Sequence, residues 1–249
     1  MLIRPDIPDR PGRNTQLQPQ ERPAWLGTLM GNIDLGVVEK HFHADRELGA
    51  MVQNHAKQAA VLVLLSGEAH ARQLPADARV LLTHRSPSLR SHSGQISFPG
   101  GRVDSTDLNE VDCALREAWE ETGLDRMSVT PLALLPQTYI RATKYPVRPV
   151  LGFAAQETAV GVIDYAETDD VFHAKLAHLI DPEQRFRVSY GSWVGDAFFY
   201  EGYVIWGFTA LVLSALIQHA GWEQPWQRER IYPLAQVLAR SKNNESSGY

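Results

Sequence analysis

The stretch from Gly202 to Trp222 contains no aspartate, glutamate, lysine or arginine, so a fold must bury it in a protein core or in a bilayer. Its length is about that of a membrane-spanning helix. However, it contains polar residues such as Gln218 and His219, and its flanking residues are acidic rather than basic. We therefore expect a strand that runs into a buried helix.

The rest of the chain has the pattern of a layered α/β domain. Apolar runs of strand length predict strands at residues 59–66, 78–85, 128–139 and 147–156. Helical spacing of apolar residues predicts helices at residues 107–122, 168–180, 208–220 and 233–241. The strands and helices alternate irregularly, which favours a layered domain over a regular doubly wound sheet.

The two ends of the chain differ from its middle. The first residues are rich in proline, arginine, aspartate and glutamine and show no periodicity, so residues 1–45 are predicted to form an irregular arm. Residues 46–240 are predicted to form one domain, and residues 241–249 a frayed tail.

Composition limits the kinds of partner. The net charge of −5 gives no general attraction to nucleic acid or to an anionic membrane, so an anionic substrate must meet a local cluster of positive groups. The single cysteine, Cys113, excludes an intramolecular disulfide framework and favours a reducing compartment. The N-terminus lacks the apolar core of a signal peptide. We expect a cytoplasmic protein without nucleic-acid or membrane partners, and the sequence leaves its oligomeric state open.

The segment "REAWEETGL" crowds glutamates onto one helical face. At 100° per residue, Glu110, Glu117 and Glu121 fall within about 20° on either side of a common line, and apolar residues gather on the opposite face. Arg116 and Glu120 are four residues apart, so the guanidinium can orient a carboxylate. The acidic stripe is either a solvated face or the binding surface of a multivalent cation.

A diglycine in front of this helix favours the cation. Gly100 and Gly101 allow close backbone approach beside the acidic stripe. Mg²⁺ and Mn²⁺ prefer carboxylate, carbonyl and water oxygens. A glycine carbonyl and two glutamates one turn apart would supply three such oxygens. The sequence therefore predicts a divalent-cation site that binds phosphate oxygens and activates water.

The stretch "GGRVDSTDLNEVDCALREAWEETGL" resembles the signature of the Nudix hydrolases. Its C-terminal half matches fully at Arg116, Glu117, Ala118, Glu120, Glu121, Gly123 and Leu124. Its front half is one residue longer than the general pattern, and the early acidic position falls on Asp107 instead of a glutamate. The resemblance implies a Nudix fold, an α/β/α sandwich around a mixed β-sheet.

This resemblance also implies roles for the box residues. Glu117 and Glu121 would be the principal ligands of Mg²⁺ or Mn²⁺, with Glu120 and the Gly101 carbonyl assisting. Arg116 would hold the carboxylates in place.

Two roles stay open at this point. Either Asp107 or Glu110 could fill the early acidic position. The general base could be Glu117 or a loop carboxylate such as Glu167 or Asp169.

The stretch "LLTHRSPSLRSHSGQISFPGG" resembles the extended motif of the coenzyme A diphosphatase branch. The longer box and the downstream "YEGYVIWGFTALVLSAL" are similar to that branch as well. The resemblance implies metal-dependent cleavage of coenzyme A, or of its acyl derivatives, to 4′-phosphopantetheine and adenosine 3′,5′-bisphosphate.

Such a substrate carries several negative charges. Arg85, Arg90 and His92, with His84 next to them, are candidates for a positive cluster that binds it, because arginine can hold phosphate with two hydrogen bonds. Gly100 and Gly101 are expected beside the substrate. Each cation could instead be an exposed loop residue.

Two other functions fit the same box. One is a pyrophosphatase for nucleoside diphosphates such as ADP-ribose or NADH. The other is a non-catalytic Nudix-fold module that binds a nucleotide.

Overall fold

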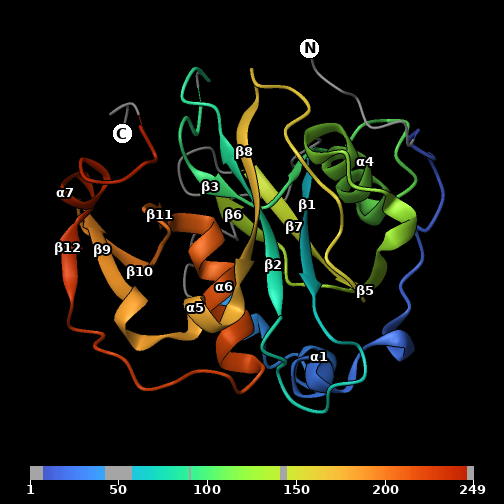
Figure 1. Cartoon of the computed structure of the whole chain (residues 1–249), viewed down its shortest axis with the longest axis horizontal. Coiled ribbons are helices and arrows are strands. Elements are labelled where there is room, and N and C mark those ends of the chain that lie inside the picture. Colours follow the sequence, from blue (N-terminus) through green and yellow to red (C-terminus); the bar gives the residue numbers. More distant parts are fainter. Residues whose placement is uncertain (1–7, 43–57, 90, 141–144, 246–249) are drawn as a thin grey trace.

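The computed structural model describes residues 8–42, 58–89, 91–140 and 145–245. Its larger sheet is mixed and has eight strands: β1 (Ala59–Ser66), β2 (Arg79–Arg85), β3 (Ile96–Ser97), β4 (Gly100–Arg102), β5 (Thr130–Leu134), β6 (Thr138–Ile140), β7 (Tyr145–Ala154) and β8 (Thr168–Lys175). A second, four-stranded sheet consists of β9 (Arg185–Tyr190), β10 (Trp193–Tyr200), β11 (Tyr203–Ile205) and β12 (Ile231–Pro233), and lies to the left in Figure 1.

The helices of the described residues are α1 (Gly27–Asp34), α2 (Glu39–Phe42), α4 (Glu110–Thr122), α5 (Leu176–Ile180), α6 (Gly207–His219) and α7 (Leu234–Leu238). Helix α4 covers one face of the larger sheet, and α1 and α6 pack on the other. This arrangement confirms the predicted α/β/α sandwich around a mixed sheet.

Strand β1 lies at the centre of the larger sheet. It runs parallel to β7 and antiparallel to β2 and β4. Leu62 and Leu64 belong to the core under α4, whereas Val63 and Leu65 belong to the core under α6. Both faces of the strand are covered, which is why its sequence is a continuous apolar run instead of an alternating one.

The local sequence fixes both ends of α4. The side chain of Asn109 accepts a hydrogen bond from the backbone N–H of Asp112 at 3.0 Å, which caps the N-terminus. Gly123 ends the helix at φ 72°, and its N–H donates to the carbonyl of Trp119. The helix predicted for residues 107–122 is therefore confirmed, with its start moved to the residue after the cap.

The helix predicted for residues 168–180 is wrong over most of its length. Residues 168–175 form β8, and only Leu176–Ile180 are helical. Strand β8 pairs with β2 from Arg79↔Lys175 to Arg85↔Thr168. Pairing along the whole of β2 provides backbone hydrogen bonds that outweigh the local helical pattern.

The irregular arm predicted for residues 1–45 is wrong for residues 24–42, which contain α1 and α2. Trp25, Leu29, Met30 and Phe42 are buried in the core beneath α6. These apolar side chains hold the segment on the domain, despite the polar composition of the residues before it. The division into an arm, a domain over residues 46–240 and a tail stays a prediction.

The tail predicted to fray is ordered at least to residue 245. Asn243 is completely buried, and its side chain hydrogen-bonds the backbone of Val204. Residues 246–249 lie outside the described residues.

The uncharged stretch from Gly202 to Trp222 forms β11 followed by α6, as predicted. Residues of α6 such as Val212, Leu213 and Ile217 are buried in the main core. In the described part of the chain, no helix has the length and apolarity that crossing a bilayer requires.

Candidate functional site

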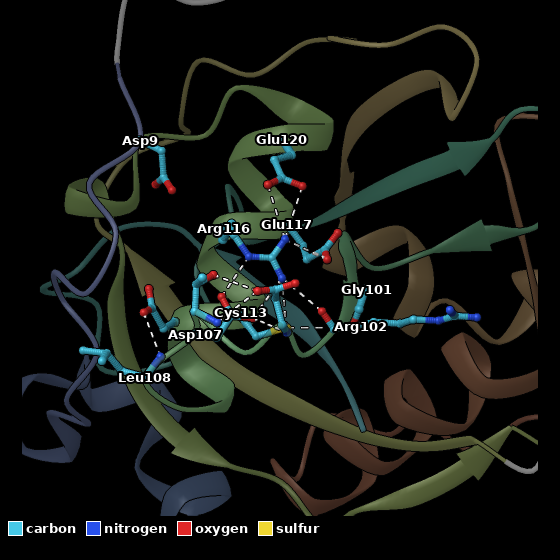
Figure 2. A network of polar contacts seen from close by, with 12 residues as sticks. Asp9, Gly101, Arg102, Asp107, Leu108, Cys113, Arg116, Glu117 and Glu120 are labelled. Carbon is cyan, nitrogen blue, oxygen red and sulfur yellow. Dashed lines mark hydrogen bonds and ion pairs between the residues drawn. The ribbon is translucent and has the colours of Figure 1, made fainter. Parts of the chain in front are cut away.

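Arg116 of α4 lies at the centre of a carboxylate cluster, shown in Figure 2. Its Nε and Nη2 donate to the two carboxylate oxygens of Asp107 at 2.8 and 2.9 Å. Its Nη1 donates to Oε1 of Glu117 at 2.9 Å and to both oxygens of Glu120 at 3.3 Å. One guanidinium therefore orients three carboxylates, which is the positioning geometry predicted for Arg116.

Asp107, and not Glu110, joins this cluster. The Asp107 side chain is 2% exposed and binds Arg116 with two oxygens. Burial alone would raise the pKa of Asp107, but the hydrogen bonds and charge of Arg116 outweigh it, and the pKa lies below its ordinary value. Glu110 begins α4 and is not among the hydrogen-bond partners of Arg116.

The diglycine lies against the acidic face, as predicted. Gly100 and Gly101 belong to β4 and pair with Val61 and Ala60 of β1. A Cβ on Gly101 would lie 2.4 Å from Cδ of Glu117, so a larger residue would displace this carboxylate. Gly100 has φ 159°, and a Cβ there would lie 2.4 Å from the Ala60 carbonyl oxygen. Glycine is required at position 100 because the backbone of β1 leaves no room, and at position 101 it leaves the Glu117 carboxylate in its place.

Glu121 is the most buried glutamate of the cluster, 7% exposed. Burial raises its pKa to about 8, and the negative charges of Glu117 and Glu167 add to the rise. The positive charge of Arg85 and a backbone hydrogen bond from Gly100 oppose it. Arg85 therefore lies close enough to act on the buried carboxylate.

The pKa of Glu117 is also raised. Burial raises its pKa, whereas the charge and hydrogen bond of Arg116 lower it without cancelling the rise. Burial is the main cause of the raised pKa of both glutamates, and neighbouring carboxyls perturbed in this way are typical of functional sites.

The chemistry of this cluster fits a hard divalent cation. Its side-chain donors are carboxylate oxygens, and the Gly101 carbonyl lies beside them. The Arg116 guanidinium binds Asp107, Glu117 and Glu120, whereas Arg85 is the positive group that acts on Glu121. Among the described residues, no three His, Cys, Asp or Glu side chains form a ready-made cage for a metal. Because Arg116 holds Glu117 and Glu120, these side chains would have to exchange guanidinium bonds for metal bonds.

Arg85 lies at the base of the predicted substrate loop. Its backbone N–H donates to the Gln95 carbonyl at 3.0 Å, and its carbonyl accepts from the Gly94 N–H at 3.0 Å. Its Nε is buried and has no hydrogen-bond partner among the described residues. A buried guanidinium nitrogen with unused donor capacity, close to Glu121, suits an anion that binds between them.

Hydrogen-bond partners engage the rings of both histidines. His84 is 2% exposed, and its Nδ1 contacts a carboxylate oxygen of Asp169. Burial lowers the pKa of His92, whose Nδ1 lies 3.0 Å from Oε1 of Gln95, so this ring is neutral at pH 7. The expectation that His84 contributes to a substrate-facing cluster is wrong, because its ring is enclosed. Arg90 lies outside the described residues.

The structure separates the candidates for the general base. Asp169 is engaged by His84. Glu167 is exposed and close enough to Glu121 to raise the pKa of that residue. Glu117 and Glu167 therefore lie at the acidic cluster, whereas the Asp169 carboxylate binds the His84 ring.

Two nearby residues were missed by the sequence analysis. The Arg102 guanidinium lies over the Tyr145 ring, 5.4 Å from its centroid, and the Arg102 carbonyl accepts from Nη2 of Arg116 at 3.0 Å. The Cys113 sulfur lies 3.8 Å from the Gly101 carbonyl oxygen. The position of Arg102 directly after the diglycine was an available signal, because a short strand there alternates its side chains.

Comparisons with known proteins identify the family that the chain resembles. Residues 56–187 match the NUDIX domain. The chain is 35% identical over 175 residues to "Uncharacterized Nudix hydrolase NudL" of Escherichia coli strain K12, which covers 68% of this chain and 84% of that protein. It is 36% identical over 146 residues to "Probable nudix hydrolase C6G9.05" of Schizosaccharomyces pombe, 55% of this chain. The matched part spans about half (49%) of the S. pombe protein.

Among solved structures, the chain resembles the crystal structure of a MutT/nudix family protein from Enterococcus faecalis. The TM-score is 0.43 and the identity 18%, with 82% of this chain and 77% of that chain covered.

Proposed function

The chain belongs to the Nudix hydrolase family, and on this basis we propose that it hydrolyses the diphosphate of coenzyme A or of its acyl derivatives. The products would be 4′-phosphopantetheine, or its acyl form, and adenosine 3′,5′-bisphosphate. The choice of substrate rests on the resemblance of residues 81–101, of the longer box and of the segment around α6 to the coenzyme A diphosphatase branch.

One observation carries the proposal of diphosphate chemistry. Three carboxylates, those of Asp107, Glu117 and Glu120, bind the single guanidinium of Arg116, and Glu117 lies directly against Gly101, which has no side chain. A diphosphate would be repelled by such a cluster unless cations lay between them. The excess negative charge therefore supports a site where divalent ions join an anionic substrate to the protein.

The residues take the following roles in this proposal. Glu117 and Glu121 hold the ions, with Glu120 and the Gly101 carbonyl assisting, and Arg116 positions the glutamates. Bound Mg²⁺ or Mn²⁺ supplies neutralisation of phosphate charge and activation of water.

The remaining steps belong to other side chains. Glu117 or Glu167 accepts the proton of the attacking water, since both lie at the cluster. Arg85 stabilises the negative charge that develops on the leaving phosphate. Arg90 and His92 remain proposed substrate contacts, and His92 would act through a hydrogen bond instead of a charge because its ring is neutral.

Hydrolysis of free coenzyme A in ¹⁸O-labelled water, with Mg²⁺ or Mn²⁺, tests the proposal. We expect chromatography to resolve the two products and mass spectrometry to find ¹⁸O in only one of them, which identifies the attacked phosphorus. Glu121→Gln is the control and should abolish turnover without unfolding the protein.

The same assay separates the other two functions. Equal or faster cleavage of ADP-ribose or NADH would show that the substrates are a broader class of nucleoside diphosphates than coenzyme A and its derivatives. Binding of these compounds without cleavage of any would make the protein a nucleotide-binding module. The presence of Glu117, Glu120 and Glu121 favours catalysis over this last outcome.

A further inference from the structure

Residues Lys242–Glu245, which we call the C-terminal clasp, connect the two sheets next to the predicted substrate loop. The Asn243 side chain is completely buried and anchors the clasp to β11. Its Oδ1 accepts from the Val204 N–H at 2.8 Å, and its Nδ2 donates to the Val204 carbonyl at 3.0 Å. An amide that matches both backbone groups of one residue fixes the position of the clasp closely.

The clasp also contacts the loop base, which we define as Arg85, Gly94 and Gln95, whose backbones are hydrogen-bonded to one another. The Asn243 carbonyl oxygen lies 2.9 Å from Nε2 of His84, and the same nitrogen lies 3.1 Å from the Gly94 carbonyl oxygen. Gly94 has φ 72°, and a Cβ on it would lie 2.3 Å from the Asn243 carbonyl oxygen. The loop base and the clasp therefore touch backbone to backbone, which leaves no room for a side chain at this glycine.

Glu245 adds a second attachment. Its Oε1 accepts hydrogen bonds from Nε1 of Trp206 at 2.8 Å and from Nδ2 of Asn243 at 2.9 Å. Gln95, at the base of the loop, lies close enough to this carboxylate to lower its pKa. Burial raises the pKa of Glu245 to about 7 in spite of these bonds, so the carboxylate is held where its charge is poorly solvated.

The clasp is linked to Arg85 through the backbone. Gly94 and Gln95, which contact the clasp, are the two residues whose backbone groups hydrogen-bond the backbone of Arg85. Arg85 in turn acts on the buried Glu121. A shift of the clasp would therefore move the loop base and change the distance between the guanidinium and the acidic cluster.

We propose that the C-terminal clasp positions the base of the substrate loop, so that Arg85 is held against the acidic cluster for binding the diphosphate of the substrate. Asn243 and Glu245 are positioning residues: they act through Gly94 and Gln95 and do not touch the substrate. This proposal rests on the proposed function.

Kinetics of three variants and one control variant test the positioning role. Asn243→Ala and Glu245→Ala each remove hydrogen bonds to a buried group, and we expect the KM for coenzyme A to rise about tenfold while kcat changes less than about threefold. Glu245→Gln should restore a KM close to that of the unmodified protein, because its amide oxygen accepts the same bonds. Asn244→Gly is the matched control: Asn244 is exposed, and its φ of 51° suits glycine.

Hydrogen–deuterium exchange at the loop base provides a readout that does not need a substrate. We expect faster exchange of the Arg85, Gly94 and Gln95 amides in Asn243→Ala and in Glu245→Ala, and no change in Asn244→Gly. Unchanged exchange would overturn the proposal. Faster exchange with an unchanged KM would also overturn it, because the contact would then be structural only.

The two proposals fail in different ways. If the unmodified protein leaves coenzyme A intact, the proposed substrate is wrong, and the same variants are compared on whichever of ADP-ribose and NADH it cleaves. If it cleaves none of them, exchange at the loop base alone decides whether the clasp holds that base. If coenzyme A is cleaved and Asn243→Ala changes neither KM nor exchange, the proposed role of the clasp is wrong and the proposed function stands.

Discussion

Helix α4 takes part in two arginine–carboxylate clusters that differ in the number of carboxylates around the arginine and in how they are enclosed. In the front cluster, Arg116 faces Asp107, Glu117 and Glu120, with Glu121 buried nearby. In the rear cluster, the guanidinium of Arg126 is 2% exposed. It donates to Asp112 at 2.6 Å and to the two carboxylate oxygens of Asp9 at 2.7 and 3.0 Å.

The difference distinguishes a closed cluster from the one that we propose as the active site. The rear cluster is closed by residues of the N-terminal segment. There, the Asn14 amide donates to the carbonyl oxygens of Arg126 and Val129, both at 2.6 Å. Its guanidinium binds two carboxylates, and backbone N–H groups of Gly12 and Leu108 also donate to Asp112. The front cluster keeps more negative charge than its guanidinium can neutralise, which is expected where a ligand completes the site.

Removing one front carboxylate should have the largest effect, and the effect should be on activity. Glu121→Gln is expected to lower kcat/KM by roughly a thousandfold, which is about 4 kcal/mol. The thermal stability should be unchanged or higher, because a neutral amide replaces a buried carboxylate whose charge is disfavoured. Steady-state kinetics and thermal unfolding of the same preparation measure both quantities.

Glu110→Gln is the matched control, since it makes the same chemical change on the same helix outside the front cluster. An equal loss of activity in this variant would show that helix charge in general, and not the cluster, supports catalysis.

Breaking the rear cluster should reverse the pattern. Arg126→Met leaves Asp9 and Asp112 without their cation in a buried site and is expected to cost about 3–5 kcal/mol of unfolding free energy. Activity per folded molecule should be largely retained at moderate temperature. Urea unfolding followed by circular dichroism measures the loss.

Arg230→Met provides the reference for an exposed pair, because Arg230 contacts Glu183 at 3.6 Å and that carboxylate is 77% exposed. It should cost no more than about 1 kcal/mol. A similar loss in both variants would contradict the contrast between buried and exposed pairs.

Divalent ions should stabilise the protein through the front cluster alone. At a concentration about 100 times the dissociation constant, Mn²⁺ is expected to add about 2.7 kcal/mol to the unfolding free energy. Thermal unfolding with Mn²⁺, compared with EDTA, measures this increment. The increment should disappear in Glu121→Gln and persist in Arg126→Met. If the increment persisted in Glu121→Gln, Glu121 would not be a ligand of the ion.

The smallest effect is expected at Cys113, which lies between the Gly101 carbonyl and Arg116. Burial raises the pKa of this thiol to about 12, from 9.0. The folded state holds the proton that the unfolded state loses, so this contribution to stability is complete below pH 9 and declines between pH 9 and 12. Iodoacetamide at pH 8 should leave the folded protein unmodified and active, whereas urea-unfolded protein should react. Rapid modification of the folded protein would contradict the burial.

The parts predicted from the sequence are those in which local signals agree with the fold. Strand β1 is a continuous apolar run between turn residues, and α4 has an amphipathic pattern and a glycine at its end. The family expected from the box is confirmed by the match of residues 56–187. The contact of Arg116 with Glu120 could be predicted because residues four apart meet on one face of a helix.

The parts that could not be predicted depend on distant partners. Strand β8 has helical spacing, and only its pairing with β2 makes it extended. His84 looked like a loop cation because the sequence does not reveal that Asp169 and Asn243 enclose it. Asn243 lies in a polar segment that looks like any frayed end, so its burial against Val204 leaves no local signal.

The contact between His84 and Asn243 joins residues 159 positions apart. On the ribosome, β1, β4 and α4 therefore emerge long before the partner that fixes the loop base, and a contact so distant in sequence closes slowly. A nascent chain can assemble its acidic helix before the base of the loop is held in place. Biosynthesis thus orders the two regions in time, with the backbone around Arg85 fixed last.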